Sequence, residues 1–298
     1  MKENKTGVIL LLITLIIFLI SSIFIVERFR TDATPREPIN LNEEEKTRTI
    51  TSDRIEEIVV SARNANVIIE TAEINHFEIT YTEHDFLSYQ FINEDNQFTI
   101  NQTNSFNLLN PAPNNVYDLT IKVPNTEIYT LNIRTTNGFV SITNARTNAI
   151  DINTSNNGII LTNVNNANLA RLRTTNGTVV LTDLKTDSLT LNTSNRRVML
   201  NDVEANDISI RNVNASVSFS NLLAFDISII TSNSNVSGTI IGRNELFNKD
   251  IVTSNGTISL DEQSFGTILN SDKDQIQPLV VYTTHADITI NFRELAND

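Results

Sequence analysis

The chain has 298 residues with 35 acidic and 22 basic side chains, which gives a formal net charge of −13, and it contains no cysteine. This acidic balance argues against a nucleic-acid-binding surface, and the absence of cysteine excludes a disulfide framework. The sequence also contains no nucleotide-binding glycine loop and no Gly-x-Ser-x-Gly nucleophile motif.

The first predicted element is a membrane-spanning helix at residues 8–26, all of which are apolar or hydroxylated, without charge, Gly or Pro. At about 1.5 Å per residue this run crosses a bilayer core of roughly 30 Å. It lacks the small-residue cleavage site of a signal peptide, so we expect an uncleaved anchor with residues 1–7 in the cytoplasm. Lys2 and Lys5 nearly balance Arg28 and Arg30, so charge does not set the orientation. The acidic, cysteine-free remainder favours a single-pass protein of the cell membrane whose C-terminal domain is extracytoplasmic.

Residues 27–54 include Pro35 and Pro38 and have little apolar content, which predicts a flexible tether. Residues 55–130 are expected to form a first, divergent coil and an N-terminal cap. Apolar residues and one Asn from Ile58 to Ile69 match the later repeat, and longer strands and a proline-containing loop follow. Repeat proteins need such a cap because a bare apolar edge would otherwise meet water or another chain.

Residues 131–293 are organised by an eight-residue phrase that returns about every 19–20 residues, as in Thr-Thr-Asn-Gly-Thr-Val-Val-Leu from Thr174. The sixth position is always β-branched, and the eighth is large and apolar except at Gly238. The third position is Asn in every copy: Asn137, Asn156, Asn176, Asn195, Asn214, Asn233 and Asn255.

A second alternating run precedes each phrase, so each repeat carries two short strands with one apolar face. The chain is therefore predicted to be all-β, a parallel β-solenoid of ~19–20-residue coils spaced about 4.8 Å apart. The phrase Asn suits a corner because it tolerates left-handed backbone angles and its amide can bond to the copies above and below. Residues 279–292 repeat the pattern once more, with His285 at the Asn position, and are expected to form the second cap.

The anchor, the strand ending Lys122-Val123-Pro124 and the recurring Thr-Ser/Thr-Asn-Gly coils resemble a bacterial family of putative-adhesin, or toastrack, β-strand-repeat domains. The resemblance covers roughly residues 58–292. It implies a right-handed parallel β-helix outside the membrane, on membrane-anchored proteins of cell-envelope stress loci, and no catalytic residues. The coils at Thr193 and Asn212 depart from the pattern because they lack the Gly.

Two surface features are candidate binding sites. The seventh phrase position, expected to point outward, is apolar in three successive coils: Ile160, Val180 and Met199. These residues form either a contact patch or a surface covered by the cap loop at residues 106–109. Arginine precedes the phrase in every second coil, at Arg134, Arg173 and Arg211. About 10 Å apart, such a basic row either binds an anionic envelope polymer or is a solvated face.

The sequence predicts no catalytic, cofactor-binding or metal site. His76, His84 and His285 are interpreted as surface residues. Asp151, Asp183, Asp202 and Asp207 are not expected to form a catalytic pair. We therefore expect a non-enzymatic binding or sensing module of the cell envelope, acting in envelope stress or adhesion, with an envelope protein or cell-wall polymer as partner. The alternatives are a polysaccharide-active β-helix enzyme and a purely structural adhesive spacer.

Overall fold

The computed structural model describes residues 42–51, 55–104, 115–125, 128–271 and 275–294. The chain divides into two units, residues 1–42 and 43–298, and the account below concerns the second. The predicted membrane helix at 8–26 and the cap loop at 106–109 lie outside the described residues. Within the described ranges, no helix has the length and apolar character needed to cross a membrane.

The described chain is almost entirely β-structure, with strands that join into one 21-stranded sheet. A single 3-10 turn, η1 (Asn244–Leu246), is the exception among the described residues. The strands are β1 (Glu44–Ile50), β2 (Glu57–Ser61), β3 (Ala65–Ala72), β4 (Phe77–Glu83), β5 (Leu87–Glu94), β6 (Gln97–Asn104), β7 (Tyr117–Pro124), β8 (Ile128–Arg134), β9 (Val140–Thr143), β10 (Thr147–Asn153), β11 (Ile159–Arg173), β12 (Val179–Thr193), β13 (Val198–Asn212), β14 (Val217–Thr231), β15 (Val236–Ile241), β16 (Phe247–Thr253), β17 (Ile258–Leu260), β18 (Gln263–Phe265), β19 (Ile268–Asn270), β20 (Gln277–Thr283) and β21 (Ile288–Arg293).

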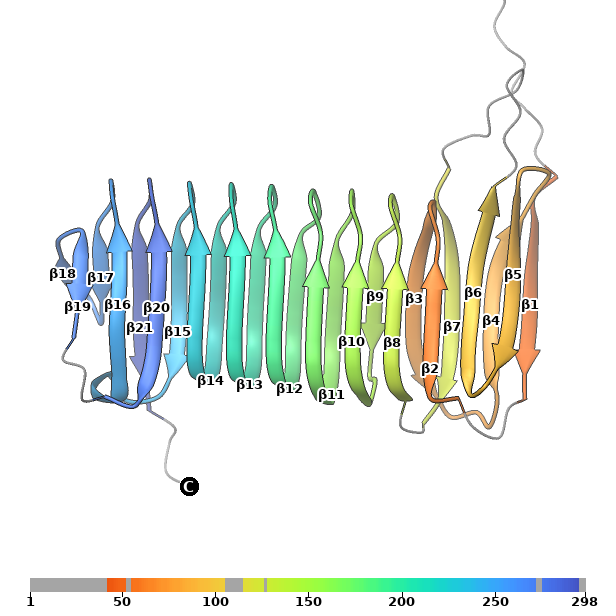
Figure 1. The fold of residues 1–298 in the computed structure, drawn as a ribbon, viewed down its shortest axis with the longest axis horizontal. Coiled ribbons are helices and arrows are strands. Elements are labelled where there is room, and N and C mark those ends of the chain that lie inside the picture. The colour runs from red at the N-terminus through yellow and green to blue at the C-terminus, as the bar shows by residue number, and fades with distance from the viewer. Residues whose placement is uncertain (1–41, 52–54, 105–114, 126–127, 272–274, 295–298) are drawn as a thin grey trace, which may run out of the picture. The chain divides into compact units, whose positions relative to one another are not determined.

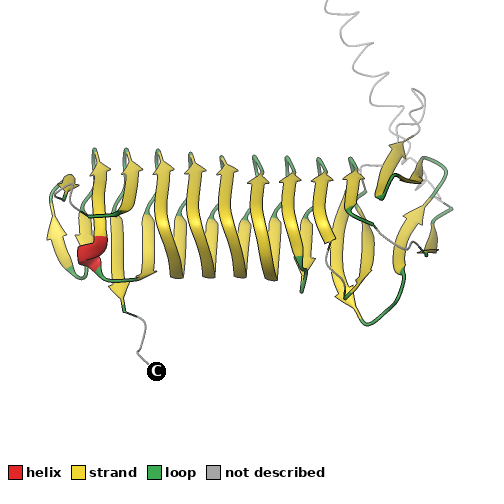
Figure 2. Cartoon of the chain, turned by 60° about the horizontal axis from the view of Figure 1, so that its bottom comes forward, coloured by secondary structure: helices red, strands yellow, loops and turns green. Residues whose placement is uncertain are grey.

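Each central coil is one long strand bent at a corner, as β12 illustrates. Residues 179–182 lie on the back face in Figure 1, residues 188–193 lie on the front face, and Asp183 makes the bend with a φ of 53°. The coils stack in parallel, with Val179 opposite Val198 and Leu189 opposite Ile208 (Figures 1 and 2). The predicted all-β solenoid with a period of 19–20 residues is therefore confirmed, whereas its right-handedness stays a prediction.

Inward side chains form columns that run through successive coils. The sixth phrase position is buried throughout, and the eighth position forms a parallel column beside it. Gly238 interrupts the second column because a Cβ there would lie 2.4 Å from the ring of Phe219 in the preceding coil. Glycine makes room for the large neighbouring ring, so the one exception to the apolar pattern preserves the packing.

The corner Asn and Asp residues, not the phrase Asn residues, adopt left-handed backbone angles. Among the described residues the phrase asparagines all have negative φ. The bend of each central coil is instead made by Asn144, Asn163, Asp183, Asp202 and Asn221, with φ between 51° and 55°. The expectation of left-handed angles at the phrase Asn was wrong. The left-handed residue is needed at the bend where the strand passes from one face to the other, and Asn and Asp adopt that conformation more readily than other residues with a side chain.

The coils at the two ends are not stacked in chain order. Strand β2 lies between β6 and β8, and β3 lies between β7 and β9. At the other end β20 lies between β14 and β16, and β21 lies between β15 and β17. The first and last coils in the sequence are thus each inserted one position inside the end of the stack.

Antiparallel strands cover both ends of the stack. Strand β4 pairs with β7 and β1, and β5 pairs with β6 at the N-terminal end. The C-terminal end is covered by β19 on β16 and β18 on β17. Because β1 belongs to the cap, the predicted tether is wrong from Glu44 to Ile50. This strand carries Lys46 and Arg48 at its outer edge, and charged residues are common on edge strands that must not recruit another chain.

Candidate binding surfaces

The phrase asparagines form a continuous ladder of amide hydrogen bonds along the turns. The side-chain Nδ2 of each Asn donates to the Oδ1 of the Asn in the preceding coil. The first bond of the ladder runs from Asn137 to Asn64 at 2.6 Å, and the last runs from Asn233 to Asn214 at 3.1 Å. The four intermediate bonds measure 2.8–3.1 Å. Each Asn inside the ladder therefore both donates and accepts, whereas Asn64 only accepts and Asn233 only donates, and the bonds hold the turns in register.

The ladder ends where the inserted coil begins. His285 lies in the turn next to that of Asn233, because the backbone N–H of His285 donates a hydrogen bond to the backbone oxygen of Ser232. Asn255 lies one coil farther, and the described residues give its side chain no hydrogen bond. The predicted ladder of side-chain hydrogen bonds therefore includes Asn233 but not Asn255.

The three predicted patch residues are neighbours on the outer surface of the back face. Ile160 lies opposite Val180, and Val180 lies opposite Met199. Ile160 is 39% exposed, whereas Val180 and Met199 are half-buried. Ser141 and Ser218 bound the patch on either side, so it is small.

The three predicted arginines lie in one row at the upper end of the front face. The register runs through Arg134, Asn153, Arg173, Asn192 and Arg211, so an arginine occurs on every second strand. With strands 4.7–4.9 Å apart, successive arginine Cα atoms lie about 10 Å apart. All three arginine side chains are exposed.

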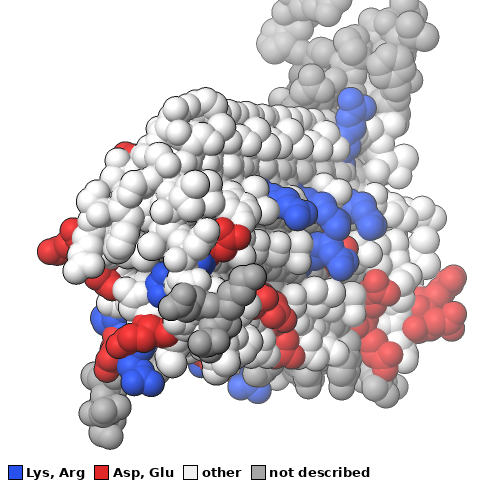
Figure 3. Space-filling model, turned by 60° about the vertical axis from the view of Figure 1, so that its left-hand side comes forward, with Lys and Arg blue, Asp and Glu red and all other residues white. Residues whose placement is uncertain are grey.

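Arg171 belongs to the same surface, although sequence analysis missed it. It lies two residues before Arg173, so the period-2 rule for a strand places both side chains outward. Asp151 is paired with Arg171 at 3.5 Å and with Arg173 at 3.6 Å. We name Arg134, Arg171, Arg173 and Arg211 the arginine face. Basic side chains gather on one part of the surface in Figure 3, in a chain that is acidic overall.

One pair of carboxylates lies on adjacent strands, and one of its two members, Asp226, is outside the set of four aspartates considered from the sequence. Asp207 lies directly opposite Asp226, and burial together with the Asp207 charge raises the pKa of Asp226. Both side chains project outward from the same face, so they do not stand on opposite sides of a substrate bond, as a glycosidase pair must. No group of three or more metal-ligating side chains occurs in the described part of the chain.

His76 and His84 make side-chain contacts within the N-terminal cap. His84 accepts a hydrogen bond from Phe86 N at 3.2 Å, and its ring lies 5.3 Å from that of Tyr117. His76 lies 3.1 Å from the side chain of its neighbour Asn75. Both residues are partly exposed in the cap, and His285 is exposed, so all three histidines reach the surface as expected.

One protein-family model covers the solenoid described above. The family model described as Toastrack DUF4097 matches residues 55–291. The chain belongs to the toastrack family. This confirms the resemblance drawn from the repeat phrase, over nearly the range expected for it.

Several solved structures are similar to this toastrack chain. A putative adhesin from Bacteroides fragilis is 10% identical with a TM-score of 0.45, over 84% of this chain and 97% of that chain. A putative adhesin from Parabacteroides merdae is 13% identical with a TM-score of 0.39, over 84% and 96%. A putative lipid binding protein from Parabacteroides distasonis is 15% identical with a TM-score of 0.39, over 85% and 98%. No curated protein matches the chain.

Proposed function

We propose that this toastrack chain is a membrane-anchored adhesive module of the bacterial cell envelope that binds linear anionic polymers through the arginine face. Residues 8–26 serve as the anchor, which their length and lack of charge support. The solenoid then lies outside the cytoplasm, as its acidic and cysteine-free sequence favours.

The observation that carries the proposal is the even spacing of Arg134, Arg173 and Arg211 across the front face. A single exposed ion pair contributes only about 0–1 kcal/mol. A polymer with regularly spaced charges can contact several of these arginines at once, and each contact after the first forms at a high effective concentration. The rigid parallel stack keeps the spacing constant, so little entropy is lost in arranging the arginines.

Asp151 has a supporting role on this face. It lies between Arg171 and Arg173 and is half-buried, so it restrains two guanidinium groups that would otherwise move freely. One carboxylate against four guanidinium groups leaves the face positively charged. Phosphate and carboxylate groups fit the planar guanidinium fork, which donates two parallel hydrogen bonds.

The test measures binding of purified poly(glycerol phosphate) to the full-length protein by isothermal titration calorimetry at several salt concentrations. The triple change Arg134→Gln, Arg173→Gln and Arg211→Gln should weaken binding about tenfold or more, because each change removes one contact from a multivalent site. Affinity of the wild type should also fall as salt rises, since exposed charges are screened.

The matched control changes three exposed arginines away from this row: Arg146→Gln, Arg243→Gln and Arg293→Gln. This variant has the same net charge as the first, so retained binding would place the polymer on the arginine face. Equal weakening by both triple variants would show that only total charge matters, and the proposal would be wrong. Absence of binding to the wild type would also refute it.

A further inference from the structure

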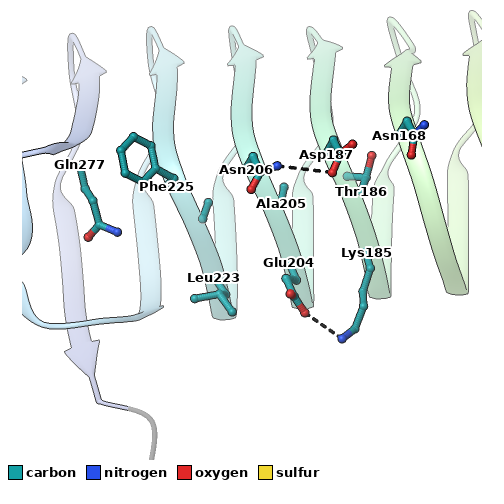
Figure 4. Close-up of a pocket in the computed structure, with 11 residues that line it drawn as sticks. Asn168, Lys185, Thr186, Asp187, Glu204, Ala205, Asn206, Leu223, Phe225 and Gln277 are labelled. Carbon is teal, nitrogen blue, oxygen red and sulfur yellow. Dashed lines mark hydrogen bonds and ion pairs between the residues drawn. The ribbon is translucent and has the colours of Figure 1, made fainter.

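A groove of about 530 Å³ crosses the coils at the lower edge of the front face, away from the row of arginines. It lies between two rows of outward side chains, which form its rims (Figure 4). The upper rim is Asn168, Asp187, Asn206 and Phe225, from β11, β12, β13 and β14. The lower rim is Lys185, Glu204 and Leu223, which are aligned in register.

The floor is shallow because the residues between the rims point inward and are small. They are Thr186, Ala205 and Ala224, each no more than 8% exposed and opposite one another on adjacent strands. Gln277 closes the groove at one end. It begins β20, the strand that replaces the next coil in chain order, so the inserted coil completes the groove.

The rims combine an exposed aromatic ring with amide and carboxylate groups. Phe225 is 48% exposed, which leaves one face of an apolar ring available at the end of the upper rim. Asn206 donates to Asp187 through a long hydrogen bond of 3.4 Å. The described residues give Asn168 and Gln277 no side-chain hydrogen bond, so their amides can both donate and accept.

The charges of the groove disfavour an anionic ligand. Lys185 and Glu204 form an ion pair at 2.8 Å and cancel one another. Asp187 remains on the upper rim, and Asp207 and Asp226 project from the strand surface beside it. A ligand rich in hydroxyl groups suits these carboxylate and amide acceptors, because it supplies donors without adding negative charge.

We propose that this groove binds a neutral, extended glycan, with about one sugar ring per coil. The rims repeat at the spacing of adjacent strands, about 4.8 Å, which is close to the length of one pyranose ring in an extended β-linked chain. The apolar face of a sugar ring stacks on Phe225, and the amides and carboxylates of the rims bind ring hydroxyls. The groove crosses four coils and ends at Gln277, so it accommodates four to five rings. This site is separate from the arginine face and goes beyond the function proposed above.

The experiment titrates chito-oligosaccharides of two to five units into the full-length protein and measures affinity by calorimetry, with cello-oligosaccharides of equal length in parallel. Affinity should increase about tenfold or more from the dimer to the tetramer and little from the tetramer to the pentamer. The change Phe225→Ala should weaken tetramer binding about tenfold, since base–aromatic stacking, the nearest measured analogue, contributes about 1–3 kcal/mol. Phe225→Trp should retain it.

Val213→Ala is the matched control because Val213 is also an exposed apolar residue, 44% exposed, but lies in a turn outside the groove. Circular dichroism establishes that each variant is folded. The triple arginine variant should bind the tetramer as the wild type does, which separates this proposal from the previous one. The proposal is wrong if no oligosaccharide of either series binds at millimolar concentration, if affinity does not depend on length, or if Phe225→Ala binds as tightly as the wild type.

Discussion

Replacing Asn176 by alanine removes a central link of the asparagine ladder and tests whether the ladder stabilises the stack. The Asn176 amide nitrogen donates to Asn156 at 3.1 Å, and its oxygen accepts from Asn195 at 2.8 Å. The substitution therefore deletes two side-chain hydrogen bonds. It leaves the backbone bond from Asn176 N to Ser155 O intact, because alanine keeps the peptide group.

The expected loss is about 1–2 kcal/mol in the free energy of unfolding. A hydrogen bond contributes about 0.5–1.5 kcal/mol net, so two bonds give about 1–3 kcal/mol. These asparagines are exposed, and water can satisfy the partners left behind, which places the loss toward the lower end.

Urea denaturation of the full-length protein, followed by circular dichroism, measures this loss. Asn192→Ala is the control, since Asn192 lies on the front face and none of the described hydrogen bonds involves its side chain. Adding Asn156→Ala completes a double-mutant cycle, which should give a coupling energy of about 0.5 kcal/mol or more for residues in contact. If Asn176→Ala is no more destabilising than the control, or if the coupling is zero, the ladder does not stabilise the fold.

Three other changes test separate features. Gly177→Ala should destabilise the fold by about 3 kcal/mol in thermal or urea unfolding, because its Cβ would lie 1.8 Å from a backbone oxygen of the preceding coil; an unchanged midpoint would show that the turn can shift. Burial raises the pKa of Tyr89 to about 12, so the folded cap holds a proton that the unfolded chain releases near pH 10. The free energy of unfolding that Tyr89 contributes below pH 10 should therefore decrease as the pH rises to about 12. The Tyr89→Phe variant should lose less free energy of unfolding over this pH range. If the outer apolar patch is a contact surface, Val180→Asp with Met199→Asp should abolish capture of an envelope partner by a protein that circular dichroism shows to be folded; equal capture would exclude the patch.

Much of the central solenoid follows from local sequence pattern. Alternating apolar residues define two strands in each coil, and the constant interval between phrases sets which residues stack. Since side chains alternate along a strand, the same pattern places Arg134, Arg173 and Arg211 in one outer row. Arg171 could have been found by the same rule, because it precedes Arg173 by two positions.

The ends could not be predicted in the same way. Residues 57–69 and 279–290 read like any other coil, and nothing local in them specifies which strands they pair with. Their neighbours are set by pairings such as Val67 with Val140, which depend on packing across a long stretch of chain. The groove was missed for a related reason, since Gln277 reaches its end only through the inserted strand β20.

Strand β1 was missed because its residues are charged and polar. Glu44, Lys46 and Arg48 give the segment the composition of a tether, but the strand forms by pairing with β4 at the edge of the cap. Lys46 also forms an ion pair with Glu83 at 2.8 Å across that pairing. Composition alone does not distinguish a charged edge strand from a flexible linker.

The inserted end coils have a consequence for biosynthesis. During translation β2 and β3 emerge early, yet all of their strand partners lie farther along the chain, from residue 97 to residue 143. The N-terminal coil therefore cannot take its place until the ribosome has released these later segments. Residues 277–293 must enter between two segments made before them. Neither end of the stack can therefore be completed in the order in which its residues are synthesised.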